Sequence, residues 1–177
     1  MDARDCTACV ACRTRARRRR RASARHATCI DQGMDRILVA LDSSPSAPMV
    51  LDAAVDLARR TGGKVHLLRA VSLPPDLPGA MFAVPSGDLT ASTVAAARSE
   101  LATFAERVPA ELRDGTTAQV GAPWDTIYEA ARELDADCIV IGAHGHGLLD
   151  RLLGTTAAKV VDHADRTVYV VRERTPH

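Results

Sequence analysis

The sequence predicts an α/β fold in which a mostly parallel, doubly wound sheet is covered by helices on both faces. From Met34 onward, apolar runs of strand length alternate with segments in which apolar residues recur every three or four positions. The runs ILVAL and CIVI are apolar at nearly every position, as in strands buried on both faces, so helices must lie on both sides of the sheet. Strands that alternate with helices in this way form a parallel sheet with right-handed crossovers.

Five segments have the composition of strands, and four segments between them have helical periodicity. The expected strands are RILVALD (36–42), KVHLLRAV (64–71), TTAQVG (116–121), DCIVIG (137–142) and TVYVVRE (167–173). The expected helices span residues 46–61, 88–107, 124–135 and 155–164. Because the 116–121 segment is the least apolar of the strands, it suits an edge of the sheet.

Turn and cap residues support these boundaries. Ser43 and Ser44 can start the first helix, Gly62 can end it, and Pro123 can open the third helix. The segment 72–88 contains four prolines and is typical of a surface loop or a lid.

Residues 1–33 form an arm whose composition differs from that of the remaining chain. The arm holds nine arginines and three aspartates, a net charge of +6, so the total charge of +1 leaves −5 on residues 34–177. An acidic body excludes nucleic-acid binding by bulk electrostatics outside the arm. The arm also holds four of the five cysteines, namely Cys6, Cys9, Cys12 and Cys29.

Three interpretations of the arm stay open. It has no apolar periodicity and its arginines repel one another, so we expect it to be disordered. In the first interpretation, the natural translation start lies near Met34 and the arm is upstream sequence included by a misplaced start. In the second, the arm is a disordered basic tail. In the third, its Cys-x-x-Cys-x-x-Cys pattern binds a metal. We expect the first of these, with a folded domain at 34–173 and a short tail at 174–177.

The composition also indicates the cellular compartment in which the protein is expected. No apolar run approaches the roughly 18 to 20 residues that a membrane helix needs, and the arm lacks the apolar core of a secretory signal. Cys138 lies within an apolar strand and is expected to be a buried small hydrophobe. A body without a disulfide framework fits a cytoplasmic protein.

A ligand site is expected at the carboxyl ends of the first and fourth strands. In an open parallel sheet, ligands bind beyond these ends, where the winding direction reverses. The first strand closes with Asp42, and the fourth opens into the stretch 142–145. Asp42 can cap the next helix, but Ser43 and Ser44 can take that role and leave Asp42 for a ligand.

The stretch GAHGHGLLDRLLGTT (142–156) is a candidate anion site. It is not a Walker A motif, since Lys-Ser or Lys-Thr does not follow G-x-x-x-x-G, and a dinucleotide fingerprint would belong after the first strand. Its glycines let backbone N–H groups approach an anion, and Gly154, Thr155 and Thr156 stand at a helix start, which favours phosphate. The alternative is a Gly-rich turn before a Thr-capped helix.

His144 and His146 raise the question of a metal. A metal site would need a third ligand, such as Asp150 or His163. Neither residue lies at a sequence spacing from the two histidines that is typical of a metal site, so no metal is expected. Either His144 contacts phosphate or fixes the loop, or the histidines simply face solvent.

These residues resemble the universal stress protein family across residues 34–173. The family's first strand ends V-A-x-D, matched here by residues 39–42. Its G-x2-G-x9-G-(S/T) motif after the fourth strand is matched by Gly142, Gly145, Gly154 and Thr155. One departure is that eight residues, not nine, separate Gly145 from Gly154.

The resemblance implies a five-stranded Rossmann-like sheet of order 3-2-1-4-5, of the adenine nucleotide alpha hydrolase type. It implies that ATP, with or without Mg²⁺, binds between strands 1 and 4. The implied contacts are Ala40, Leu41, Asp42 and Ala70 for adenosine, and Gly142, His144, Gly145, Gly154, Thr155 and Thr156 for phosphates. Strand 167–173 would pair with its counterpart in a homodimer, which also removes an exposed sheet edge.

We therefore expect an ATP-binding stress-response protein that acts as a nucleotide-dependent regulator on an unidentified protein partner. The sequence offers phosphate donors but no evident general base aimed at a water, so at most weak ATP hydrolysis is expected. Two alternatives stay open: a small phosphate-ester hydrolase or nucleotidyl transferase that uses His144 or His146, and a ligand-free dimeric interaction module.

Overall fold

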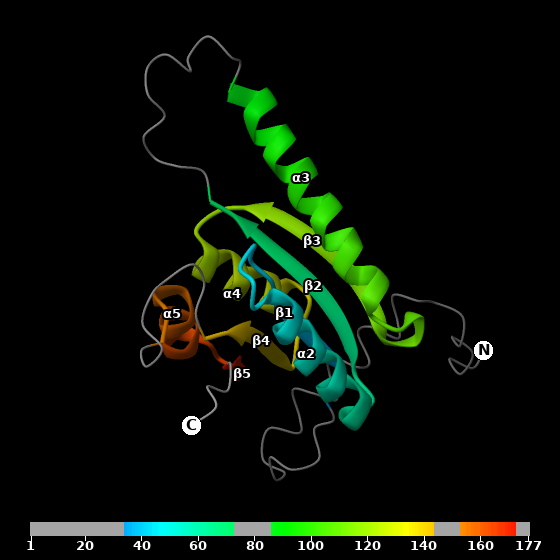
Figure 1. Cartoon of the computed structure of the whole chain (residues 1–177). Helices are drawn as coiled ribbons and strands as arrows, with labels where there is room; N and C mark the ends of the chain where they lie inside the picture. Colours follow the sequence, from blue (N-terminus) through cyan, green and yellow to red (C-terminus); the bar gives the residue numbers. More distant parts are fainter. Residues whose placement is uncertain (1–33, 73–85, 144–152, 173–177) are drawn as a thin grey trace, which may run out of the picture. The chain divides into compact units, whose positions relative to one another are not determined.

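The computed structural model describes residues 34–72, 86–143 and 153–172, drawn in colour in Figure 1. The elements follow in chain order as β1 (Arg36–Ala40), α2 (Ala47–Thr61), β2 (Lys64–Val71), α3 (Ser86–Arg107), the 3₁₀ helix η2 (Ala110–Leu112), β3 (Arg113–Val120), α4 (Pro123–Glu133), β4 (Cys138–Gly142), α5 (Thr155–His163) and β5 (Thr167–Val171). The predicted arm at 1–33 lies outside the described residues, as does most of the predicted 72–88 loop.

The five strands form one parallel sheet of order β3-β2-β1-β4-β5, which confirms the expected topology. The central strand β1 pairs on one side with β2 and on the other with β4, so that Val39 lies opposite both Leu67 and Val140. The 116–121 segment was expected at an edge, and β3 does lie at the edge of the sheet. No helix in the described part of the chain is long and apolar enough to cross a membrane.

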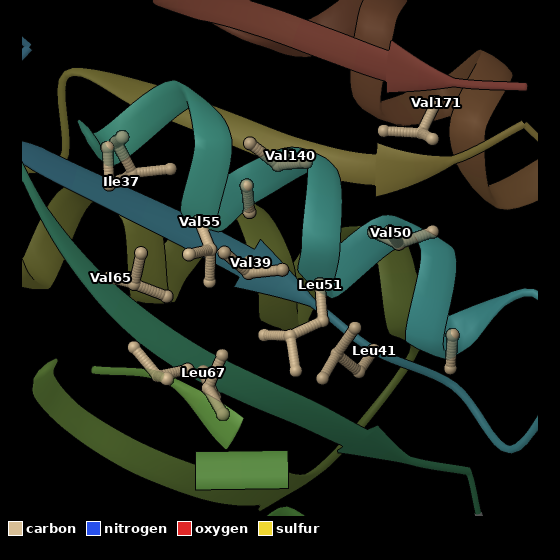
Figure 2. Packing of buried hydrophobic residues seen from close by; sticks show 14 of the residues in the cluster. Ile37, Val39, Leu41, Val50, Leu51, Val55, Val65, Leu67, Val140 and Val171 are labelled. Atoms are coloured by element: carbon tan, nitrogen blue, oxygen red, sulfur yellow. The ribbon is translucent and has the colours of Figure 1, made fainter. Parts of the chain in front are cut away.

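Alternate residues of the central strands pack into two cores on opposite faces of the sheet. Ile37, Val39 and Leu41 lie in the core that α2 and α3 cover. Leu38 faces the other way, into the core that α4 and α5 cover. Figure 1 shows α2 lying across the sheet, and Figure 2 shows its Leu51 directed toward the strands. Burial on both faces explains why residues 37–40 of β1 and 138–141 of β4 are all apolar.

The connection from α2 to β2 depends on two glycines. Gly62 is the C-cap of α2 and has φ +73°, a left-handed conformation that costs glycine little. Gly63 is buried, and a Cβ on it would lie 2.0 Å from the carbonyl oxygen of Met34. The prediction that glycine ends this helix is confirmed.

Some boundaries differ from those expected. The first helix begins at Ala47 with Ser46 as its N-cap, so the prediction that Ser43 and Ser44 cap it was wrong. The reason is that Ser44 hydrogen-bonds to Asp42 instead, as described below. Strand β3 starts at Arg113, three residues before the expected start, because its first residues join the sheet through backbone pairing with β2 and carry no apolar pattern.

Cys138 is fully buried in β4, as expected. Burial raises the pKa of its thiol to about 11. A thiol that stays protonated near neutral pH is a poor nucleophile, so Cys138 fills the core and offers no reactive group.

Candidate functional site

The carboxyl ends of β1 and β4 lie side by side, as the predicted site requires. Ala40, the last residue of β1, pairs with Leu68 of β2 and with Ile141 of β4. The chain winds away from β1 in opposite directions, through α2 to β2 on one side and through β4 to β5 on the other. This reversal is the point at which open α/β sheets bind ligands.

Asp42 is held in a fixed orientation by the turn that follows β1. Its Oδ1 accepts a hydrogen bond from the backbone N–H of Ser44 at 3.0 Å and a second from the Ser44 hydroxyl at 2.5 Å. The Ser44 hydroxyl also lies 2.8 Å from that of Ser46. Asp42 is exposed whereas Ser44 is buried, so a buried serine positions an exposed carboxylate at the end of the sheet.

The residues expected to meet adenosine face different sides of the sheet. Leu41 is buried, and its side chain packs into the core under α2, beside Leu51 in Figure 2. Its side chain is therefore directed away from the α4 face, toward which the half-buried Ala40 packs. Ala70 is half-buried near the end of β2, two positions after Leu68 and thus on the same face as Leu68. Small side chains at 40 and 70 suit the approach of a flat ring on this face.

The chain after β4 returns to the strand end before α5 begins. The Ala143 N–H donates to the Val171 carbonyl, and the Gly154 N–H donates to the Ala143 carbonyl, both at 2.8 Å. Gly154 is the N-cap of α5, and the helix begins at Thr155. This hydrogen bond places the first turn of α5 next to Gly142 and Ala143 in space.

The N-terminus of α5 has the character of an anion site. The N–H groups of its first turn have no partner within the helix, and the helix dipole adds partial positive charge there. Its first turn holds no acidic residue, and Gly154 offers no side-chain cap. Thr155 is exposed and Thr156 is half-buried, so both are placed where a phosphate could reach them.

His144 and Gly145 lie outside the described residues, as do His146 and Asp150. The described residues of the predicted site lie together at the carboxyl ends of the strands: Ala40, Leu41, Asp42, Ala70, Gly142, Gly154, Thr155 and Thr156. Within the described residues, no group of three His, Cys, Asp or Glu side chains could hold a metal ion. The His163 ring lies against Trp124, with the ring centroids 5.3 Å apart and the planes tilted by 42°, and its Nδ1 lies 2.9 Å from the Lys159 carbonyl oxygen.

Sequence reasoning missed Arg69, a buried arginine near the end of β2. Its guanidinium donates a hydrogen bond to the carbonyl of Leu41 at 3.3 Å and forms an ion pair with Glu100 of α3. The available signal was a single arginine inside the apolar strand KVHLLRAV, since a charged residue is rarely buried unless it is paired.

The sequence model of the universal stress protein family matches residues 33–172. Universal stress protein A homolog 1 of Coxiella burnetii is 31% identical over 138 residues, which are 76% of this chain and 94% of that protein.

Solved structures show the same fold. The universal stress protein UspA from Lactobacillus plantarum is 29% identical, with a TM-score of 0.66, and the match covers 78% of this chain and 98% of that one. The universal stress protein from Archaeoglobus fulgidus in complex with dAMP is 26% identical, with a TM-score of 0.52 and the same two coverages.

Proposed function

The chain belongs to the universal stress protein family, and from this premise we propose that it binds ATP at the carboxyl ends of β1 and β4. One observation carries the proposal: the hydrogen bond from Gly154 to the Ala143 carbonyl holds the N-terminus of α5 next to the carboxyl end of β4. The complex of the Archaeoglobus fulgidus protein with dAMP supports an adenine nucleotide as the ligand class. The protein then acts as a nucleotide-dependent regulator of the stress response.

The phosphates bind at the start of α5 and the Gly-rich segment before it. The N–H groups and hydroxyls of Thr155 and Thr156 donate to phosphate oxygens. Gly142 and Gly154 carry no side chain and leave room for the phosphates to approach the backbone. His144 and Gly145 complete this set. The physical basis is the partial positive charge and the free donors of a helix N-terminus, which match a polyanion without a lysine.

Adenosine binds at the ends of β1 and β2. Ala40 and Ala70 leave space for the ring, and Leu41 contributes through its backbone because its side chain is in the core. The Asp42 carboxylate, already oriented by Ser44, accepts hydrogen bonds from the ribose. A carboxylate beside the phosphates can also take part in holding Mg²⁺.

An ATP titration of the full-length chain tests this proposal. We expect wild type to carry co-purified adenine nucleotide and to bind ATP, and Gly142→Val to weaken binding at least tenfold by obstructing the backbone approach. The control Ala158→Val adds similar bulk to an exposed residue of α5, one turn after its N-cap Gly154. This variant should bind ATP within about twofold of wild type. Absence of both bound nucleotide and titration would refute the proposal in favour of a ligand-free interaction module.

The same protein also distinguishes a regulator from an enzyme. We expect ATP to be hydrolysed at most slowly, and a His144→Ala or His146→Ala variant to turn over at the same slow rate. Multiple turnovers per second that either substitution abolishes would instead identify a phosphate-ester hydrolase or nucleotidyl transferase.

We also propose that two copies pair through β5. This strand lies at the edge of the sheet, and Tyr169 on it and Val161 on α5 are exposed to 47% each. Light scattering should give twice the 18.9 kDa chain mass for wild type and the single mass for Tyr169→Lys. Val120→Lys on the opposite edge strand β3 is the matched control and should stay dimeric. A monomeric wild type, or a dimer lost only in Val120→Lys, would contradict this interface.

A further inference from the structure

Arg69 is buried in a position that demands a structural or functional explanation. It is 8% exposed and lies on the face of β2 that packs against α2 and α3, like Leu67 two residues earlier. A buried guanidinium loses its hydration and needs hydrogen-bond partners in compensation. Glu100, whose side chain is 53% exposed, supplies one partner from the surface of α3.

The second partner of Arg69 is at the nucleotide site. Its Nη1 donates to the carbonyl oxygen of Leu41 at 3.3 Å, at the point where the chain leaves β1. The N–H of Leu41 still continues the sheet by donating to Leu68 at 2.9 Å. The arginine thus holds the peptide group immediately beyond the last sheet hydrogen bond of β1.

The Leu41 carbonyl and the Asp42 N–H belong to the same planar peptide unit. A hydrogen bond that fixes this carbonyl therefore fixes the peptide plane that carries the Cα of Asp42. Ser44 holds the same residue from the other side, by two hydrogen bonds to the Asp42 carboxylate. The Asp42 segment is consequently anchored on both sides, once through its backbone and once through its side chain.

We infer that Arg69 is a positioning residue for the adenosine end of the site, and that Glu100 on α3 keeps its guanidinium directed at the Leu41 carbonyl. This inference rests on the proposed nucleotide binding. Arg69 itself packs on the α2 side of the sheet and acts on the ligand only through the Leu41–Asp42 peptide. The phosphate end, at α5, is placed by other hydrogen bonds and should not depend on it.

The test compares three ligands on four full-length proteins by calorimetry: ATP, adenosine and tripolyphosphate, with wild type, Arg69→Met, Glu100→Gln and Arg107→Met. Arg69→Met keeps an unbranched apolar stem in place of the arginine stem but removes the guanidinium donors. Arg107→Met removes an arginine in the last turn of α3 that pairs with Asp52 of α2 at 2.9 Å, away from the Leu41 carbonyl. It is the matched control for losing an arginine–carboxylate pair.

We expect Arg69→Met to weaken ATP and adenosine about tenfold, the size of effect typical for a lost charged hydrogen bond, and to leave tripolyphosphate within about twofold. Glu100→Gln should move the same two ligands in the same direction by a smaller factor, and Arg107→Met should change none. Because Glu100 is on the surface, its variant carries the test if Arg69→Met does not fold.

Two results overturn the inference while leaving nucleotide binding intact. One is unchanged ATP and adenosine binding in folded Arg69→Met and in Glu100→Gln. The other is an equal loss for all three ligands, which would mean a general loosening of the fold. A wild-type chain that binds none of the three refutes the proposed function itself, and the inference with it.

Discussion

A negative charge placed at the start of α5 should have opposite effects on folding and on nucleotide binding. Thr155 is the first residue of α5 and is exposed, and the first turn of this helix carries no acidic residue. The substitution Thr155→Glu therefore adds a carboxylate beside the free N–H groups of the turn. The proposed phosphate site and the helix dipole both have their positive charge at this place.

The two magnitudes follow from simple electrostatics. A carboxylate in the first turn of a helix stabilises it by about 0.3 to 1 kcal/mol, so the free energy of unfolding should rise by that amount. A phosphate at about 5 Å from the new carboxylate is repelled by about 1 to 3 kcal/mol at an effective dielectric constant of about 80 to 20. ATP affinity should accordingly fall by roughly 5- to 150-fold.

The assay is urea unfolding without ligand, combined with calorimetric titration of ATP. Thr155→Gln is the matched control, because glutamine has the shape of glutamate without its charge. Thr155→Gln should lack the stabilisation. It should lose only the contribution of the Thr155 hydroxyl to ATP affinity and bind ATP more tightly than Thr155→Glu does. A Thr155→Glu protein that gains stability yet binds ATP as tightly as Thr155→Gln would refute the proposed phosphate site, since phosphate would then not lie at the α5 N-terminus.

Three further predictions concern the body of the fold. Leu51→Ala should lower the free energy of unfolding by about 2 to 5 kcal/mol in urea titrations, because Leu51 of α2 is fully buried in the core between α2 and the sheet; a loss below about 1 kcal/mol would contradict this packing. Burial lowers the pKa of His66 in the folded protein below 6.5, its value in the unfolded chain. Unfolding therefore takes up a proton at a pH between the folded-state pKa and 6.5, and stability should fall as the pH drops below about 6.5. His66→Gln should flatten that decrease in urea midpoints measured from pH 5 to 8, and an unchanged slope would exclude His66 as its source. Cys138 should resist alkylation at pH 8 in the folded protein and react on unfolding, as peptide mass spectrometry would show, because burial raises its pKa to about 11; rapid labelling without urea would contradict this.

The sheet was predictable from the sequence because burial leaves a pattern. Residues 37–39 of β1 and 138–141 of β4 are buried on both faces of the sheet and are all apolar. Gly62 marks the end of α2 by a conformation that suits glycine. The start of β3 was not predictable in this way. Arg113 and Gly115 join the sheet by backbone pairing, which leaves no trace in the apolar pattern.

The site was predictable only in its outline. Parallel pairing of β1 and β4 places Asp42 and Gly142 at the same carboxyl end of the sheet, and glycine followed by threonine marks the start of α5. The hydrogen bond between Ser44 and Asp42, and the reach of Arg69 to Leu41, depend on side-chain directions set by the tertiary structure. Periodicity and spacing carry no information on either contact.

The central claim is that an adenine nucleotide sits between the end of β1 and the start of α5, and mapping of backbone amide chemical shifts during an ATP titration tests it most directly. We expect ATP to cause the largest shifts in two groups of amides, those of Gly154, Thr155 and Thr156 and those of Leu41 and Asp42. Tripolyphosphate should shift only the first group. Saturation by ATP with the largest shifts elsewhere, or no shifts at saturating ATP, would contradict it.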